Sequence, residues 1–265
     1  MSRALRVSTR NANFQQWQAL LTNRTKRHRA GEFLVQGVRP ISLAVEYGWE
    51  IRDLIYPDRR ALSGWARDVL ARTGARAVAM SPELVAELAD KEDAELIAVV
   101  GMAPSAPIMA DRHLLVVVFD RPGTPGNVGT LVRSADAFGA SAVIITGHAA
   151  DPYDPKAVRA STGSLFALPV LTADSVEGAL SLLPRGVQIV ATDEHGRVDV
   201  DEHDMTGPTA ILVGNETVGL SAAWRDAAHV TVRIPITGAA SSLNAAAAGT
   251  VVLYEAVRQR ARPTR

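Results

Sequence analysis

The sequence predicts an α/β protein with two domains, a smaller one over residues 1–106 and a larger one over residues 107–265. One observation behind this prediction is that short apolar runs alternate with helix-like stretches in both halves of the chain, as they do in α/β folds. The other is the composition of residues 101–113 (GMAPSAPIMADRH), which are rich in proline and alanine. Such a stretch is typical of a linker between domains.

The elements of the smaller domain follow from local patterns. A helix is predicted over Phe14–Leu21, where apolar residues recur at helical spacing, and another around Ile41–Tyr47. Ser81 is a predicted N-cap, with Pro82 in the first helical position. Short apolar runs predict strands at Glu32–Val35, Ile51–Tyr56 and Leu96–Val100.

The larger domain contains continuous apolar runs of the kind found in buried parallel strands. Each run is bounded by Gly, Pro or Asp, and helix-like stretches separate the runs. The runs are Leu114–Phe119, Ala142–Thr146, Val187–Ala191, Ala210–Val213 and Val230–Ile234. We therefore expect a parallel sheet covered on both faces, with a ligand site at the carboxyl ends of its strands.

Charge is distributed unevenly along the chain, although the formal net charge is zero. Residues 1–40 contain eight Lys and Arg and one acidic residue, which leaves 20 basic and 27 acidic residues in the rest. Such a basic arm fits either a polyanion-binding surface or a merely solvated terminus. The absence of cysteine excludes disulfides and thiol nucleophiles, and no apolar run is long enough to cross a bilayer. We expect a cytoplasmic protein with no membrane partner.

Three segments that follow predicted strands have the composition of a functional site. Residues 120–135 place a Gly/Pro-rich loop before a helix that begins near Asn127. Residues 211–221 place Asn and Glu in a tight turn, and residues 234–249 lead from Pro and Gly into an alanine-rich helix. Taken singly, each segment also fits an ordinary turn or a buried helix. The smooth alanine surface favours close packing, either against a loop of the same chain or against a second subunit.

Together the three segments contain the motifs NxGxxxRSAxxFG, GNExxGLS and IPxxGxxSSLNxxxA, with Ala160–Ser164 (ASTGS) after the first. In this order, residues 112–258 resemble the SpoU (TrmH-like) branch of the SPOUT RNA methyltransferases. The stretch FQQWQALLTNRTKRHRAGEFLVQGVRPISLAVE resembles in particular the avilamycin-resistance enzymes, which methylate a uridine ribose of 23S rRNA.

The resemblance implies a C-terminal domain with a deep trefoil knot and a smaller, L30e-like N-terminal α/β domain that binds RNA. It also implies S-adenosyl-L-methionine (SAM) as the cofactor, held in the knot by backbone groups and apolar walls. The residues expected around SAM are Gly214, Ile234, Leu243, Thr192, Asn215, Leu212, Val213 and Ile236.

The implied reaction is methyl transfer to a ribose 2'-OH of RNA. Because this hydroxyl has a pKa far above 7, a base or a nearby positive charge must stabilise the developing alkoxide. We expect Arg133 to supply that charge. Thr217 and Ala245–Ala246 depart from the family pattern, which puts only fine positioning in doubt. The groups expected to orient the reactants are Asn127, Glu216, Ser242 and Asn244.

SpoU-type enzymes usually act as homodimers in which the partner completes each site, and the smooth helix at Ala245–Gly249 fits such a contact. The expected RNA partner is 23S rRNA, held through phosphates and shape. The residues expected to hold it are Arg24, Lys26, Arg27, Arg29 and Arg39. A second basic group near the C-terminus fits either a small patch or a frayed tail, and comprises Arg258, Arg260, Arg262 and Arg265.

Other functions stay open at this point. A tRNA substrate would keep the enzyme class, whereas a non-catalytic RNA-binding protein would keep only the fold. A nucleotide-dependent dehydrogenase is disfavoured because the GxGxxG fingerprint is absent. The clusters Asp193–His195 and Asp201–Asp204 suggest a metal site, but their spacing matches no usual ligand set and the family reaction needs no metal, so none is expected.

Overall fold

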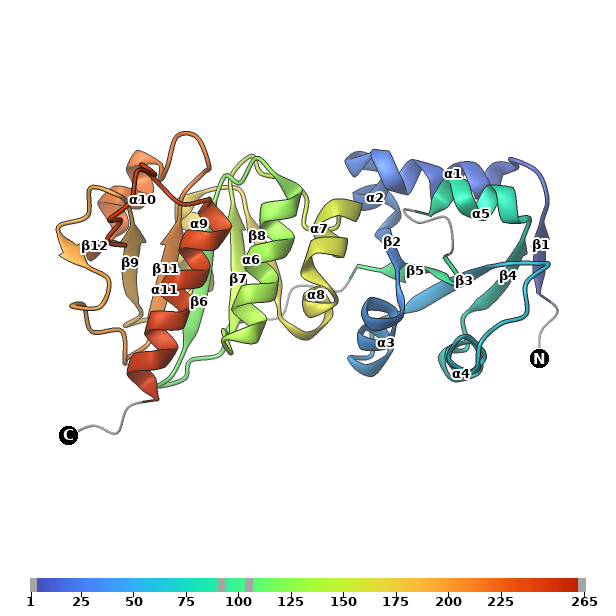
Figure 1. The fold of residues 1–265 in the computed structure, drawn as a ribbon, viewed down its shortest axis with the longest axis horizontal. Helices are drawn as coiled ribbons and strands as arrows, with labels where there is room; N and C mark the ends of the chain where they lie inside the picture. The colour runs from blue at the N-terminus through green and yellow to red at the C-terminus, as the bar shows by residue number, and fades with distance from the viewer. Residues whose placement is uncertain (1–3, 90–93, 103–106, 262–265) are drawn as a thin grey trace. The chain divides into compact units, whose positions relative to one another are not determined.

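The computed structural model describes residues 4–89, 94–102 and 107–261, which form two compact units (Figure 1). The first unit comprises residues 1–104 together with 153–167, and the second comprises the rest. The predicted boundary after residue 106 borders residues 103–106, which lie outside the described residues. The sequence prediction places residues 153–167 in the second domain, whereas their contacts are with the first unit.

The first unit is built on a five-stranded mixed sheet in the order β1-β4-β3-β5-β2. Its strands are β1 (Leu5–Val7), β2 (Glu32–Gln36), β3 (Ile51–Pro57), β4 (Arg76–Met80) and β5 (Ile97–Gly101). Its helices are α1 (Ala12–Thr22), α2 (Arg24–Ala30), α3 (Val38–Glu46), α4 (Gly64–Thr73), α5 (Pro82–Leu88), α7 (Pro155–Ser161) and α8 (Ser164–Ala167). Helices α1 and α5 cover one face of the sheet, and α3 and α4 lie on the other (Figure 1).

Local sequence explains these elements and their limits. Helix α1 begins after Asn11, whose side chain accepts a hydrogen bond from the N–H of Phe14 at 3.1 Å. Helix α5 begins at Pro82 as predicted, but the Ser81 side chain makes no capping hydrogen bond. The predicted strands correspond to β2, β3 and β5, while β1, β4 and α4 have no counterpart in the prediction.

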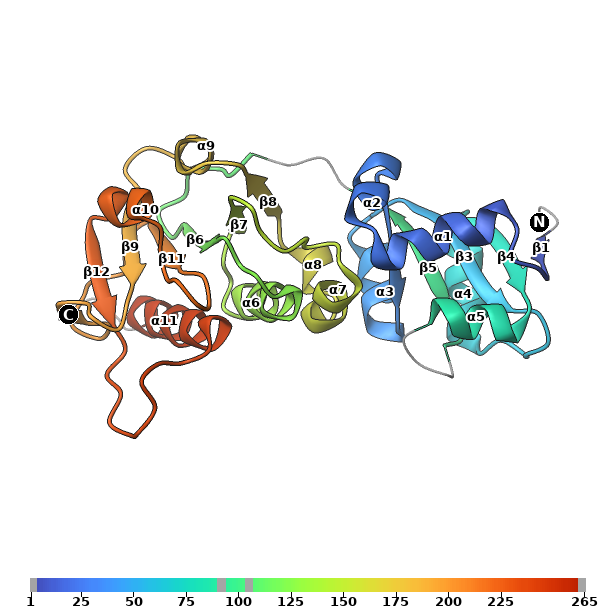
Figure 2. The same cartoon turned by 90° about the horizontal axis from the view of Figure 1, so that it is seen from above.

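The second unit contains a seven-stranded sheet in the order β10-β12-β9-β11-β6-β7-β8. Its strands are β6 (Leu115–Asp120), β7 (Ala142–Thr146), β8 (Val170–Ala173), β9 (Gln188–Thr192), β10 (Val198–Asp199), β11 (Thr209–Val213) and β12 (Val230–Arg233). Every pairing recorded between these strands is parallel, so the predicted parallel sheet is confirmed. Helices α6 (Pro125–Ala137) and α11 (Ala245–Arg260) cover one face, and α9 (Val176–Leu182) and α10 (Ala222–Ala227) cover the other (Figure 2).

Helix α11 packs against α6 and β11, and Gly249 allows the close approach. A Cβ at Gly249 would lie 2.6 Å from Cδ1 of Leu131 and 3.0 Å from Cγ2 of Val213. Gly249 therefore packs within the chain, but against a helix and a strand and not against the loop expected above. A contact of this segment with a second subunit stays a prediction. The trefoil knot stays a prediction.

Arg260 at the end of α11 anchors the helix rather than fraying. Its guanidinium donates to the carbonyls of His113 at 2.6 Å, Leu114 at 3.2 Å, Met205 at 3.0 Å and Gly207 at 2.7 Å. Arg262 and Arg265 lie outside the described residues. Across the described part of the chain, the helices are too short or too polar to span a membrane.

Candidate active site

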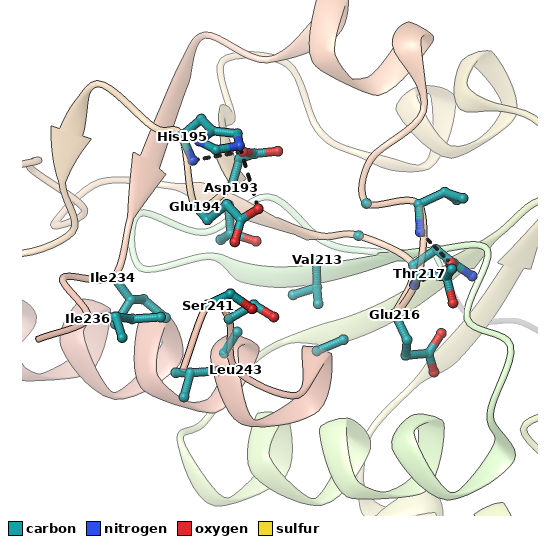
Figure 3. A pocket seen from close by; sticks show the side chains of 18 of the residues that line it. Asp193, Glu194, His195, Val213, Glu216, Thr217, Ile234, Ile236, Ser241 and Leu243 are labelled. Atoms are coloured by element: carbon teal, nitrogen blue, oxygen red, sulfur yellow. Dashed lines mark hydrogen bonds and ion pairs between the residues drawn. The ribbon is translucent and has the colours of Figure 1, made fainter. Parts of the chain in front are cut away.

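A cavity of about 410 Å³ lies at the carboxyl ends of β9, β11 and β12 (Figure 3). The turn at Asp193–His195 forms one side of it, and Ile234, Ile236 and Leu243 lie on the other. Its volume falls within the ~300–1,000 Å³ typical of small-molecule sites. Seven of the residues expected around the cofactor line this cavity together: Thr192, Val213, Gly214, Asn215, Ile234, Ile236 and Leu243.

The wall between β11 and α10 is a tight turn that glycine makes possible. A Cβ at Gly214 would lie 2.6 Å from the carbonyl carbon of Gly219 and 2.7 Å from the backbone nitrogen of Leu220. The Asn215 side chain is used within the turn: its Oδ1 accepts from the N–H groups of Thr217 at 2.8 Å and Val218 at 3.1 Å. The Asn215 side chain thus stabilises the turn itself, and Glu216, Thr217 and Val218 line the cavity beside it.

A chain of hydrogen bonds joins all three sequence motifs beside the cavity. Glu216 accepts from the backbone N–H groups of Gly123 at 2.9 Å and Thr124 at 3.2 Å, and from Nδ2 of Asn127 at 2.8 Å. Oδ1 of Asn127 accepts in turn from Nδ2 of Asn244 at 3.1 Å. Because a carboxylate only accepts, it fixes the orientation of Asn127 and hence that of Asn244.

Asn244 completes this chain by capping α11. Its Oδ1 accepts from the N–H groups of Ala246 at 3.0 Å and Ala247 at 3.3 Å. The start of α6, the turn after β11 and the start of α11 are thus held in one register around the cavity.

Family comparisons agree with this arrangement. Residues 114–254 match the model of the SpoU rRNA Methylase family, and residues 11–98 match the SpoU L30e-like domain. The chain belongs to the SpoU rRNA methylase family. The family, fold class and enzyme class predicted from the sequence motifs are confirmed.

Relatives of this SpoU protein match it over nearly its whole length. The 23S rRNA (uridine(2479)-2'-O)-methyltransferase of Streptomyces viridochromogenes is 54% identical, over 97% of this chain and 93% of its own. The solved SpoU methyltransferase AviRb of that organism, in complex with AdoMet, has a TM-score of 0.90 at 54% identity and covers 95% of this chain and 98% of its own. An AdoMet-bound rRNA methyltransferase from Sinorhizobium meliloti has a TM-score of 0.86 at 30% identity, covering 96% and 98%.

Under the turn of this SpoU site lies a buried polar network that the sequence prediction did not include. Asp120, 2% exposed at the end of β6, accepts from the N–H of Ser221 at 2.7 Å and from the hydroxyl of Thr146 at 3.2 Å. Nη2 of Arg121 donates to Asp120 and to the carbonyl of Gly219, each at 3.1 Å, while the Arg121 carbonyl accepts from Asn215 at 2.7 Å. In the sequence, the signal for such a network is an acidic residue, Asp120, at the end of an apolar strand.

The remaining expected catalytic residues lie apart from the hydrogen-bonded chain. Ser242 lines the cavity in the loop before α11. Arg133 is exposed on α6, does not line the cavity, and makes no hydrogen bond or ion pair within the described ranges. The Asp193–His195 segment, considered above as a metal cluster, is a wall of the cavity. Among the residues that the structure describes, no group of three His, Cys, Asp or Glu could hold a metal ion.

The pKa of Glu216 lies below its usual value. Burial is the largest single influence and raises this pKa, but the hydrogen bonds from Gly123, Asn127 and neighbouring N–H groups together outweigh it. A depressed folded-state pKa stabilises the fold above the ordinary glutamate pKa of about 4.3, and this stabilisation is lost as the pH falls through the lowered value.

Glu216→Gln is therefore expected to lower the free energy of unfolding by about 1 kcal/mol at neutral pH, since the exposed position screens the charge. The glutamine amide would bring a donor to a place where three donors converge. Urea denaturation of wild type and variant from about pH 7 to pH 3 tests this. The difference should shrink below about pH 4; a difference that stays constant would contradict the role of the charge.

One of the five residues expected to bind RNA is not on the surface, which corrects the prediction. Lys26 and Arg29 on α2 and Arg39 on α3 are exposed, as is Arg24. Arg27 is 2% exposed: its Nη1 donates to the carbonyl of Leu20 at 2.8 Å, and it pairs with Asp154 at 3.5 Å. One face of α2 packs inward, so Arg27 is not available to an RNA phosphate.

Arg27→Ala is expected to lower the free energy of unfolding by about 2–3 kcal/mol, because it removes the donor from a buried carbonyl and the cation from Asp154. Lys26→Ala, on the exposed face of the same helix, should change stability by less than about 0.5 kcal/mol. Thermal unfolding of both variants is the measurement. An Arg27→Ala protein as stable as wild type, with weakened RNA binding, would restore the original prediction.

Proposed function

We propose that this chain transfers a methyl group from SAM to a ribose 2'-OH of 23S rRNA, on a uridine as in its Streptomyces relative. The observation that carries the proposal is the hydrogen-bonded chain Glu216–Asn127–Asn244, which joins the three motifs beside the cavity. The cavity suits SAM, because apolar side chains such as Val213, Ile234 and Leu243 can hold an adenine ring. Polar residues, among them Thr192 and Ser241, line the same cavity.

SAM, when bound, supplies a methyl group on a positively charged sulfur. The residues of the chain then have to place the 2'-OH in line with it and stabilise the oxygen as its proton leaves. Ser242 lines the cavity and can donate to or accept from a ribose hydroxyl. Arg133 has no partner within the described residues, so its guanidinium is free to lie beside the developing alkoxide.

The relatives favour rRNA over tRNA. The rRNA enzymes named above match the whole chain, including the L30e-like domain. Two tRNA-modifying neighbours, one acting on C/U34 and one from A. aeolicus, cover 56% of it with TM-scores of 0.52 and 0.50. The N-terminal domain is thus the part that supports a ribosomal substrate.

Tritium transfer from labelled SAM to 23S rRNA, 16S rRNA and tRNA tests this function. We expect label in 23S rRNA alone, at one site that becomes resistant to alkaline cleavage because its 2'-OH is methylated. Label in tRNA alone would refute the rRNA substrate but keep the enzyme class. SAM binding with no transfer to any RNA would favour the alternative of a non-catalytic RNA-binding protein.

The proposal includes a homodimer whose contact surface contains α6 and α11. On α11, Val251 and Tyr254 are 37% and 56% exposed, and the Tyr254 ring meets that of Phe138 edge-on at 6.0 Å. Exposed apolar side chains of this size on one helix are typical of a subunit contact.

Sedimentation equilibrium should give twice the chain mass for wild type and a monomer for Tyr254→Glu. Tyr47→Glu changes a tyrosine of similar exposure on the first unit and should stay dimeric. A monomeric wild type would refute this part of the proposal.

The assigned substrate also gives an expected phenotype. We propose a cytoplasmic enzyme that protects ribosomes from avilamycin, as its resemblance to AviRb suggests. Expression in an avilamycin-susceptible bacterium should raise the inhibitory concentration, and an inactive variant should not. If the rRNA is methylated but both strains are equally susceptible to avilamycin, the methylation does not confer resistance.

A further inference from the structure

A second cavity, of about 650 Å³, lies next to the active-site cavity and shares Asp193 and His195 with it. Its other walls come from the chain around β10, from α10 and from the start of β12. We call it the cationic cavity, defined by Arg197, Arg225 and His229, because two arginines line it. His195 and Thr231, whose side chains can also donate hydrogen bonds, line it as well.

The two arginines of the cationic cavity carry charges that no carboxylate neutralises among the described residues. Arg197 is exposed and makes no hydrogen bond or ion pair there. Arg225 donates to the carbonyl of Leu220 at 2.5 Å. Arg233, on the adjacent strand, is by contrast paired with Asp199 at 2.5 Å. Two unneutralised guanidinium groups lining one cavity repel each other, and a bound anion would relieve this repulsion.

His229 adds a neutral donor of fixed orientation. Its Nδ1 accepts a hydrogen bond from the N–H of Ile189 at 2.8 Å, so the ring hydrogen is carried by Nε2. Asp193 is the acidic side chain that lines the cavity, and its Oδ1 accepts from the N–H of His195 at 2.9 Å.

We infer that the cationic cavity binds a backbone phosphate of the RNA strand that carries the target ribose. This rests on the proposed function, because the target 2'-OH must lie in the active-site cavity and the strand must continue past its rim. The turn at Asp193–His195 separates the two cavities, which places the cationic cavity beside the path of a flanking nucleotide. Arginine matches the spacing of two phosphate oxygens with paired N–H groups, and His229 adds a third donor.

Filter binding of transcribed 23S rRNA to wild type, Arg197→Gln and Arg197→Gln/Arg225→Gln tests the inference over a range of salt concentrations. For the double variant we expect Kd to rise about tenfold and the slope of log Kd against log salt to fall by about one unit. Affinity for SAM, measured by calorimetry, should stay unchanged. Arg185→Gln is the matched control, because Arg185 is exposed near the amino end of β9, away from both cavities.

Wild-type affinity and salt slope in the double variant would overturn the inference, as would an equal loss in Arg185→Gln. Stabilisation of wild type alone by inorganic phosphate, without any change in RNA affinity, would also overturn it, because the cavity would then serve a small free anion. If wild type binds RNA but transfers no methyl group, the proposed function fails while the binding comparison still decides the inference.

Discussion

Arg133→Ala is expected to lower kcat for methyl transfer by about 10²–10³-fold, the usual cost of removing a group that stabilises a developing oxyanion. The affinity for SAM should stay unchanged, because Arg133 does not line the cavity. Single-turnover tritium transfer and calorimetry measure the two quantities separately. Arg133→Lys should recover part of the rate, since it restores the charge without the planar fork. Arg185→Ala removes an exposed arginine elsewhere and should have no effect.

In the proposed homodimer, Arg133 is expected to act on the cavity of the partner subunit, because it is exposed on α6 and does not line the cavity of its own chain. Mixing Arg133→Ala chains with chains unable to bind SAM should then restore about a quarter of wild-type activity, because half of the dimers carry one intact site. No recovery after mixing would show that Arg133 acts within its own chain. Loss of SAM affinity in Arg133→Ala would contradict its role as a charge that acts on the ribose.

Sequence patterns predict the second unit better than the first. Five of the seven strands of its sheet were predicted as apolar runs. Of these, β6, β7, β9 and β11 are buried along most or all of their length, whereas only Val232 of β12 is buried. The edge strand β8 was not predicted because its apolar run after Pro169, Val170 and Leu171, is only two residues long, and β10 has two residues. Helix α2 (RTKRHRA) escapes for a related reason: its buried residue is Arg27, and charge normally indicates an exposed face.

The burial of Arg27 depends partly on Asp154, which is distant in the sequence, in addition to the carbonyl of Leu20 seven residues away. Local patterns cannot indicate such a contact. The same holds for the active site, where Glu216 and Asn127 are 89 residues apart and Asn127 and Asn244 are 117 apart. Their assembly was predicted from the order of the family motifs. The Asp120 network and the Asp193–His195 wall were not predicted, because Asp120, Arg121 and the wall residues lie outside those motifs, although the network reaches Asn215, Gly219 and Ser221 inside the second motif.

Gly214→Ala is expected to weaken SAM binding by about 100-fold and to lower the free energy of unfolding by about 2–3 kcal/mol. The new methyl group would lie 2.6 Å from the carbonyl carbon of Gly219 and 2.7 Å from the nitrogen of Leu220, and backbone cannot move aside as a side-chain end can. The hydrogen bonds that join Asn215 and Gly219 in both directions, each 3.1 Å long, would have to open. The turn would then no longer form its wall of the cavity.

Calorimetric titration with SAM, on protein shown to be folded by circular dichroism, measures the effect of Gly214→Ala. Gly207→Ala is the matched control, because a Cβ there meets nothing within 4 Å. The turn both forms a wall of the cavity and, through Glu216, holds the start of α6. Glu216→Gln tests the second role alone, because it loosens the link to α6 without adding volume beside Gly219. Because the steric clash acts on the cavity wall and the charge acts on the neighbouring helices, Gly214→Ala should cost far more SAM affinity than Glu216→Gln. Equal losses would show that the turn is positioned from α6 and not by its own backbone packing.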